Sequence, residues 1–513
     1  MFKKITLFVA IVSFVAPSLS TFAQDAGALL DLLVKKKIIT DQEAEEVRAE
    51  LSKQVSETSG GKWKLSSPIT EIELYGDARV RYEYRGGRTG DNGPLGTAGA
   101  GVAGHDDWQE RERERYRLRL GLRGTLVDDW FFGVRLETST SPRSTNVTFG
   151  DDSGVNGPFS KNSDAISVGQ AYLGYKGFKD ITLTAGRMPQ PLVTTLMVWD
   201  ADINPEGAAE QWKHTFNLEF GAANSVAASE GYSKEGGKGI VAPAPSEPFK
   251  LKIDVFANFA QFIYDDSNPE NPLGRRARVS SSAGNATFQT NDLIPTADAF
   301  MFAWQLGARV TFPNNVYVQA APTMYNYTGD GDTFNIHFQG GSPFVTNAAS
   351  LAQNQTGINS LLVFDMPWEV GWKVGELPMR LFGDFAVNLE GDDRADAAGH
   401  PDHHGNNYAY QVGLAIGQLK VKHDWELRGW WQHTDQYALD PNLVDSDIFD
   451  SRVGMQGIAL QAGYALSDAI IFNVTWAYGW PSNHNLGTGG IGDIGINPLS
   501  QYQIFQADLN VKF

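Results

Sequence analysis

From residue 70 to the end of the chain, apolar and polar residues alternate with a period of two. Between Ile72 and Tyr84, apolar, small or aromatic residues occupy every second position, and mostly charged residues lie between them. Between Arg115 and Leu126, leucines alternate with arginines in the same way. Successive side chains of a strand point to opposite faces, so this pattern predicts strands with one apolar and one polar face.

About 16 segments have this character, a number that leaves room for an aqueous channel in a closed barrel. Short connections such as 127–129 alternate with long ones such as 139–164, which is typical of outer-membrane barrels. The segment 221–247 is long where a short turn is expected, and either a hidden strand pair or an insertion would explain it. The predicted strands are 70–84, 115–126, 130–138, 165–175, 181–188, 209–220, 249–264, 299–312, 315–328, 358–373, 377–389, 408–419, 424–436, 455–466, 469–480 and 502–513.

The last predicted strand ends on the carboxy-terminal residue and has one apolar face, which contains Phe505, Leu509, Val511 and Phe513. In a membrane barrel the apolar face contacts lipid and the polar face lines the lumen. An amphipathic strand that closes a soluble sandwich is the alternative for this segment taken alone. A terminal strand that ends in Phe resembles the signal by which barrels reach their assembly machinery, so these four residues are the expected insertion signal.

The amino-terminal part has a different character. Residues 1–23 have the charged start, short apolar centre and small residues of a secretory signal peptide. Residues 24–55 predict a periplasmic helical hairpin, whose second helix begins at Thr40 with a capping box to Glu43. Residues 56–69 are a linker, and 70–513 are the predicted barrel. The hairpin is too short to bury a core alone.

Composition narrows the possible partners. The 513 residues include no cysteine and carry a net charge of −18, and the mean hydropathy is −0.29. No stretch after the signal peptide approaches the ~20 continuous apolar residues of a membrane-spanning helix, but membrane strands need only alternation. The negative charge argues against nucleic acid as a partner. Closed strand pairing would hold such an exported chain together without disulfides.

Arginines give the sharpest local chemical signal. The leucines that alternate with them must face lipid, because a charge at the membrane midplane costs roughly 2–4 kcal/mol. Neighbouring arginines repel one another unless acids or anions lie between them, and Asp77 and Asp508 are candidates. Two interpretations remain open: a field or binding path for anionic solutes, and a structural network that stiffens the wall. The arginines are Arg79, Arg81, Arg115, Arg117, Arg119 and Arg123.

Together, the strands, the loops, the amino-terminal helices and Phe513 resemble the bacterial outer-membrane porins. The nearest likeness is to the putative-porin type related to the phosphate-selective porins. This resemblance implies an outer-membrane homotrimer that contacts lipid and lipopolysaccharide and passes small hydrophilic solutes. It also implies an inward-folded third loop, here 188–208, whose acids Asp200, Asp202 and Glu206 face a ladder of basic residues. The six arginines match such a ladder in type, although they crowd onto the first two strands.

Metal binding and catalysis find little support. His400, His403 and His404 lie near several aspartates, but their spacing matches no defined metal site, and a solvated loop is expected. The common hydrolase, phosphate-loop and metalloprotease motifs are missing from the sequence. A lipase-like site on the rim is the enzymatic alternative. We therefore expect neither a cofactor nor an enzyme.

The predicted function is that of a porin, a water-filled outer-membrane channel for passive diffusion of small hydrophilic solutes and ions. The predicted fold is an all-β transmembrane barrel of about 16 antiparallel strands, preceded by the helical hairpin. A substrate-selective channel for phosphate or organic acids is one alternative. A non-conducting surface barrel that acts as an adhesin or receptor is the other.

Overall fold

The computed structural model describes residues 66–88, 108–141, 143–150, 165–220, 249–265, 277–282, 285–290, 299–328, 358, 360–398, 400–484, 486, 488–490, 493–494 and 499–513. Residues Pro68–Phe513 form one compact unit. The expected signal peptide, the helical hairpin and most of the linker lie outside the described residues, as does the segment 221–247.

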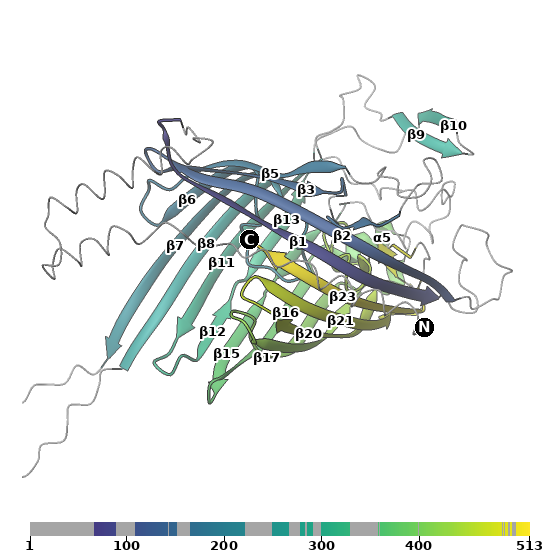
Figure 1. Cartoon of the computed structure of the whole chain (residues 1–513). Helices are drawn as coiled ribbons and strands as arrows, with labels where there is room; N and C mark the ends of the chain where they lie inside the picture. The colour runs from purple at the N-terminus through teal and green to yellow at the C-terminus, as the bar shows by residue number, and fades with distance from the viewer. Residues whose placement is uncertain are drawn as a thin grey trace, which may run out of the picture. The chain divides into compact units, whose positions relative to one another are not determined.

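Antiparallel strands form a single closed sheet (Figure 1). Closure occurs at β1, which pairs with β2 along one edge and with the last strand, β23, along the other. The strands of this sheet are β1 (Ile69–Arg88), β2 (Trp108–Leu126), β3 (Trp130–Thr138), β4 (Val147–Thr148), β5 (Ile166–Tyr175), β6 (Ile181–Arg187), β7 (Glu206–Phe220), β8 (Phe249–Asp265), β11 (Ala299–Thr311), β12 (Tyr317–Ala320), β13 (Thr323–Thr328), β14 (Leu362–Asp365), β15 (Trp368–Val374), β16 (Leu377–Asn388), β17 (Tyr408–Gly417), β18 (Trp425–Thr434), β20 (Met455–Ala465), β21 (Ile470–Pro481) and β23 (Gln501–Lys512).

Sixteen crossings of the barrel wall result from these strands in the part of the chain that the structure describes. The strand β4 extends β3 along β2, and two crossings are each interrupted once, as β12 with β13 and β14 with β15. The prediction of a barrel of about 16 antiparallel strands is confirmed. Two small sheets, β9 (Ala277–Ser282) with β10 (Asn285–Thr290) and β19 (Arg452–Val453) with β22 (Gly489–Gly490), lie in connections.

Prolines interrupt the two crossings that the sequence predicts as continuous, 315–328 and 358–373. Pro322 separates β12 from β13, and Pro367 separates β14 from β15. Proline cannot donate a ladder hydrogen bond, so a strand that contains it is broken or irregular at that point. The carbonyl groups of both prolines still accept hydrogen bonds from neighbouring strands, at 3.0 Å from the amides of Leu306 and Ala321. These bonds keep the wall closed at the interruptions.

Exposure separates the two faces of the barrel wall. On β2, Leu118 and Leu120 are 45% and 42% exposed, whereas Arg115 and Arg117 are 5% and 6% exposed. The leucines therefore point away from the lumen and the arginines into it, as the cost of charge in lipid requires. On β23, the polar residues Gln506, Asp508 and Asn510 are buried, and the residues between them are partly exposed.

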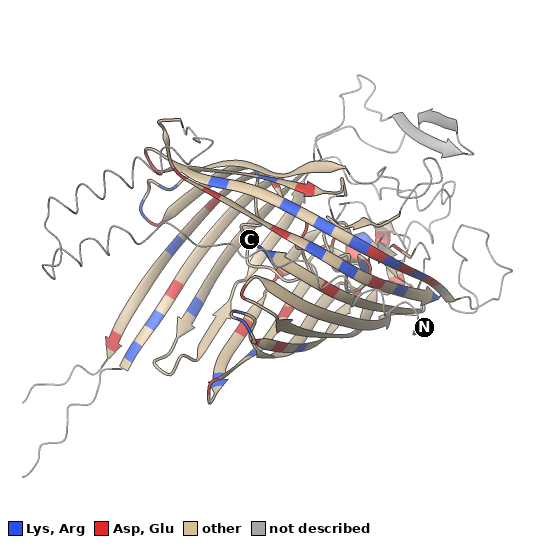
Figure 2. Ribbon diagram, viewed as in Figure 1, with Lys and Arg blue, Asp and Glu red and all other residues tan. Residues whose placement is uncertain are grey.

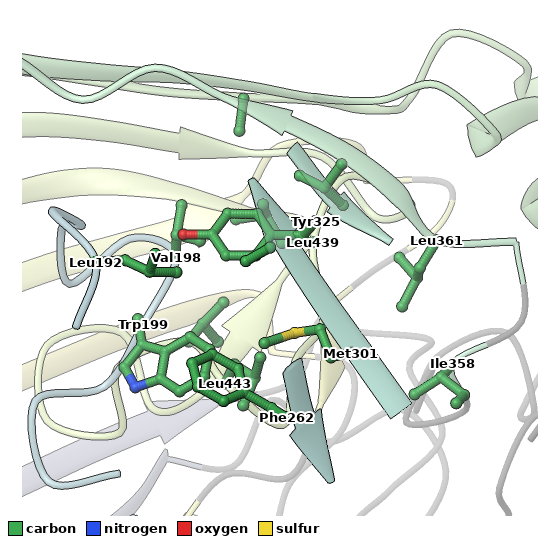
Figure 3. Close-up of a cluster of buried hydrophobic side chains, with 14 of the residues drawn as sticks. Leu192, Val198, Trp199, Phe262, Met301, Tyr325, Ile358, Leu361, Leu439 and Leu443 are labelled. Carbon is green, nitrogen blue, oxygen red and sulfur yellow. The ribbon is translucent and has the colours of Figure 1, made fainter. Parts of the chain in front are cut away.

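Two long connections fold into the barrel. We call residues 188–205 the β6–β7 loop and residues 435–454 the β18–β20 loop. Their apolar side chains form one buried cluster with the walls of β8, β11 and β13 (Figure 3). Trp199 packs on Phe262, with 5.9 Å between ring centroids. Leu439 and Leu443 from the β18–β20 loop belong to the same cluster. The largest hydrophobic core of the described chain therefore lies inside the barrel.

Helices are few in the described ranges. The helix α5 (Gly391–Ala397) and the 3-10 helix η1 (Pro401–His403) lie in the connection between β16 and β17. No described helix is long and apolar enough to cross a membrane. The histidines singled out in the sequence lie in this connection, where His404 contacts the carboxylate of Asp396 at 2.7 Å.

Candidate functional site

Inward-facing arginines concentrate on β1 and β2, and we call this region the arginine wall. Figure 2 shows the alternating basic and acidic positions along these two strands. The strand register places like charges directly opposite one another, since Arg79 pairs with Arg117 and Arg81 with Arg115. Like charges at paired positions destabilise a sheet unless acids separate them. The arginines of the wall are Arg79, Arg81, Arg85, Arg113, Arg115, Arg117 and Arg119.

Glu83 is the central acid of the arginine wall. Its side chain is fully buried and accepts from Arg85 at 3.0 Å and from Arg115 at 3.3 Å. It also forms an ion pair with Arg113, and the guanidinium of Arg81 lies 3.6 Å away. A neutral Glu83 would leave four buried arginines without this counter-charge, and a buried charge without a partner is costly. The four arginines therefore favour the ionised form of Glu83.

The β6–β7 loop reaches the lower part of the arginine wall through Asp202. Its carboxylate lies 3.6 Å from Arg117 and 3.5 Å from Arg119. Both arginines also pair with Asp77 on β1, at 2.8 and 2.7 Å. Two arginines and two aspartates therefore meet where the loop approaches the wall.

The β18–β20 loop supplies acids that the sequence analysis missed. Asp447 lies 2.9 Å from Arg81 and 3.2 Å from Arg85, and Asp450 lies 2.8 Å from Arg85. Asp508 on β23 completes the set by pairing with Arg81 at 2.6 Å. In the sequence, the acids of 437–454 resemble those of any solvated loop. Only the fold brings them to the arginines.

Asp493, between β21 and β23, pairs with Arg113 at the upper end of the wall. Burial opposes its ionisation, but Arg85 and Arg113 together lower the pKa of Asp493 to about 2. This aspartate therefore stays ionised at neutral pH and offsets part of the positive charge of the wall.

Asp200 joins the two inner loops and does not contact the arginine wall. Its carboxylate accepts from the amides of Asp202 and Ser446, both at 2.9 Å, and its own amide donates to Leu443 at 2.6 Å. Burial and the neighbouring charge of Asp202 raise the pKa of Asp200 to about 7. Its position favours a role in holding the loops together.

Two further expected site residues lie away from the wall. Glu206 is the first residue of β7, so the loop ends at 205 and not at 208, and its carboxylate pairs with Arg187 at 3.2 Å. Arg123 lies near the end of β2, is largely exposed, and pairs with Glu73 at 2.6 Å. Neither residue reaches the inner loops through any ion pair among the described residues.

A polar cavity of about 190 Å³ lies beside the upper arginine wall. Arg143, in the connection after β3, lines this cavity and donates to the carbonyl of Pro441 at 3.2 Å. No described carboxylate lies within 4 Å of Arg143, unlike the arginines of the wall. The remaining lining residues are Arg85, Arg115, Ser139, Ser141, Ser144, Asn146, Ser446, Ser451 and Asp493.

A second cavity, of about 470 Å³, lies beneath the β6–β7 loop on another part of the lumen. Arg380, which lines it, bridges Glu369 and Glu426 at 3.3 and 2.8 Å. The guanidinium of Arg428 lies over the ring of Phe382, 5.4 Å from its centroid. Charges in this cavity are also paired.

The expected insertion signal lies at the seam where the barrel closes. Phe513 and Gly76 exchange two backbone hydrogen bonds, of 2.8 and 3.1 Å. The phenyl ring of Phe513 covers Gly76, where a Cβ would come within 2.8 Å of the ring. Phe505 lies opposite Tyr84, and Leu509 lies opposite Val80 on the same outer face. The terminal strand is thus part of the wall along its whole length.

A closed barrel of this size, with an apolar outer face and a charged lumen narrowed by inner loops, is a channel of the outer membrane. A family model described as "Putative porin" matches residues 34–370 of the chain. The chain belongs to this family. It is a porin of the bacterial outer membrane, through which small hydrophilic solutes diffuse passively. The family is one of channels and not of enzymes.

Solved porin structures also match the chain. OprB of Pseudomonas putida matches with 12% identity and a TM-score of 0.41, over 86% of this chain and 94% of that one. OmpF of Salmonella typhi, in complex with daunomycin, matches with 9% identity and a TM-score of 0.38, over 88% and 99%. The outer membrane channel DcaP of Acinetobacter baumannii matches with 13% identity and a TM-score of 0.36, over 88% and 100%. No curated protein sequence matches the chain.

Proposed function

We propose that solutes cross this porin along the arginine wall and that charges on this side of the lumen set its ion preference. The observation that carries the proposal is the buried apolar cluster, which joins both inner loops to the walls of β8, β11 and β13. That cluster leaves no polar path through its own volume. The polar cavity lies instead between the arginine wall and the β18–β20 loop.

A mild preference for anions is expected. Most arginines of the wall have carboxylate partners, so their fields largely cancel at a distance. Arg143 has no such partner among the described residues, and hydroxyl groups of Ser141, Ser144 and Ser446 line the same cavity. Guanidinium and hydroxyl donors suit carboxylate or phosphate groups. This cavity is the observation that favours an anion-selective channel as the second candidate function.

Planar-bilayer recording tests the proposed function. Purified protein should give stepwise currents that rise with salt, and a salt gradient should give a zero-current potential displaced slightly toward anions. Arg143→Gln should reduce that displacement, and Lys176→Gln, in a turn on the opposite side of the membrane, is the matched control. Protein that inserts but gives no current would contradict the channel proposal. An unchanged potential in Arg143→Gln would remove Arg143 from the path.

We infer that Phe505, Leu509, Val511 and Phe513 form the signal for membrane insertion. The seam geometry supports this inference, because loss of Phe513 would remove both of its hydrogen bonds to Gly76 and expose the edge of β1. Deleting Phe513 should lower the amount of heat-resistant folded barrel in membrane fractions. Phe513→Tyr, which keeps an aromatic terminus, is the control. An undiminished folded yield after deletion would contradict the inference.

We also infer a homotrimer surrounded by lipid and lipopolysaccharide, assembled by the barrel assembly machinery. The exposed apolar side chains of the outer face, such as Leu74 and Leu118, support contacts with lipid or with neighbouring subunits. Cross-linking in native membranes should give trimers. A chain that begins near residue 62 tests whether the amino-terminal hairpin contributes to them. Monomers alone in the full chain would contradict this assembly.

A further inference from the structure

The cavity of about 470 Å³ beneath the β6–β7 loop is separate from the polar cavity beside the arginine wall, because the two share no lining residue. Its volume falls in the range of about 300–1,000 Å³ that is typical of small-molecule sites. Leu196 and Ile448, one from each inner loop, contribute to its lining. Gln319 and Arg428 lie near the starts of β12 and β18, directly after short connections. The cavity therefore lies between the inner loops and the end of the barrel that has the short turns.

Gln411 of β17 is a buried amide in this cavity without a protein partner. Its side chain is 6% exposed and forms no hydrogen bond with any described residue. The amide of Gln319 lines the same cavity and likewise has no hydrogen bond within the described ranges. A buried amide without partners is costly, and an amide both donates and accepts. These two side chains therefore favour a ligand that offers donors and acceptors together.

Arg428 of β18 also has unused hydrogen-bonding capacity. Its Nε has no acceptor, and its ion pair with Glu426 spans 3.6 Å. The guanidinium lies over the ring of Phe382, 5.4 Å from the centroid. A guanidinium has several N–H donors, so Arg428 can bind acceptor oxygens of a ligand without losing a hydrogen bond to a described residue.

The charged groups at this cavity balance one another. Arg380 bridges Glu369 and Glu426 at 3.3 and 2.8 Å, and Glu426 also pairs with Arg428. Two carboxylates thus offset two guanidinium groups. A solute with a net charge would gain little from such a set, because attraction to one sign is cancelled by repulsion from the other. The cavity therefore favours an uncharged ligand.

The remaining wall is partly apolar, through Leu196, Ile448 and the ring of Phe382. A sugar matches this mixture, since its C–H groups can pack on apolar side chains while each hydroxyl donates and accepts. A wholly apolar ligand would leave Gln411 unpaired. We propose that this cavity is a binding site for a neutral sugar. The proposal rests on the proposed function in one respect, since the sugar must enter the lumen to reach the site.

Calorimetric titration of the intact protein in detergent tests for the site without any need for conduction. The probes are D-glucose and sucrose, and at least one of them should give saturable heat. D-glucuronate, which has the ring of glucose and a carboxylate, should bind more weakly than glucose. Tighter binding of glucuronate, or of the zwitterion alanine, than of either sugar would overturn the proposal. The absence of saturable heat with both sugars would also overturn it.

A matched pair of variants assigns the binding to the cavity. Gln411→Leu should weaken sugar binding about tenfold, the loss expected for one hydrogen bond, and it removes no bond to a described residue. Gln432→Leu is the control, because Gln432 of β18 is also a buried amide, 8% exposed, but does not line the cavity. Gln319→Leu is a second site variant should Gln411→Leu fail to fold. Equal sugar affinity in the site variants and the control would overturn the proposal.

Planar-bilayer recording tests whether the sugar binds inside the lumen. The sugar that binds should reduce the wild-type current more than the Gln411→Leu current, and this difference corrects for the effect of sugar on bulk conductivity. Equal reductions in the two proteins would place the bound sugar outside the lumen and overturn the proposal. Protein that binds the sugar in calorimetry but conducts no ions would instead contradict the proposed function, and the sugar site would still stand.

Discussion

The arginine wall and the wall opposite it differ in how they stabilise buried polar groups in the barrel lumen. The arginine wall brings seven arginines together and offsets them with acids from β1, β23 and both inner loops. The opposite wall is mainly apolar and packs against the inner loops, and its buried residues Asp365 and Asp384 form no ion pair with a described residue. Figure 2 shows this difference in the charged positions of the strands.

The comparison shows that the number of charged groups in a region and the electric field that they leave in the lumen are separate properties. Charges at close range in a lumen of low dielectric interact strongly, so paired groups stabilise the wall and have little remaining field. Arg143 is one charge against seven in the wall, but it forms no ion pair with a described carboxylate. We therefore propose that the structural network and the selective path, left open by the sequence, involve different arginines.

The largest expected effect comes from removing the central acid of the arginine wall. Glu83→Gln leaves Arg81, Arg85 and Arg113 without their shared carboxylate, and breaking such a buried set typically costs about 3–5 kcal/mol. The folded barrel in detergent should lose stability in urea by that order. Glu73→Gln is the control, because the Glu73–Arg123 pair is exposed and should contribute nothing measurable. Equal stability of the two variants would mean that the wall does not depend on its acids.

A second, electrical test separates the lower arginine wall from the rest. Changing Arg117 and Arg119 to Ser would leave Asp77 and Asp202 without their cations. The zero-current potential in a salt gradient should move toward cations. Arg123→Ser, at the exposed end of the same strand, should leave it nearly unchanged. Normal conductance with an unmoved potential in the double variant would place these two arginines outside the path.

Much of this architecture could be predicted from the sequence because strand alternation is local. The leucine and arginine faces of residues 115–126 follow from the pattern and from the cost of charge in lipid. The family resemblance predicted that residues 188–208 fold inward as a loop. The loop ends at residue 205, because Glu206 belongs to β7 and pairs with Arg187 on the neighbouring strand. The strand breaks at Pro322 and Pro367 could also be predicted from the sequence, because proline lacks the amide hydrogen that a strand ladder needs.

The β18–β20 loop could not be predicted in the same way. Its acids reach Arg81 and Arg85 across more than 360 positions of sequence, and no local spacing encodes such a contact. Leu439 and Leu443 are the signal that could have been noticed, since two leucines in a long loop of an exported protein suggest burial.

The smallest expected effect concerns the junction of the two inner loops, where Asp200 accepts from the amide of Ser446 at 2.9 Å. Burial and Asp202 raise the pKa of Asp200 from the ordinary 3.8 to about 7, so the folded state favours the protonated form. Stability from this group is therefore fully present below the ordinary value and is lost as the pH rises through about 7. Hydrogen exchange of the Ser446 amide, corrected for its intrinsic rate, should be slower in mildly acidic than in mildly alkaline solution. Asp200→Asn keeps an acceptor without the charge and should remove this pH dependence. Protection of the Ser446 amide that increases with pH in the wild type would contradict the prediction.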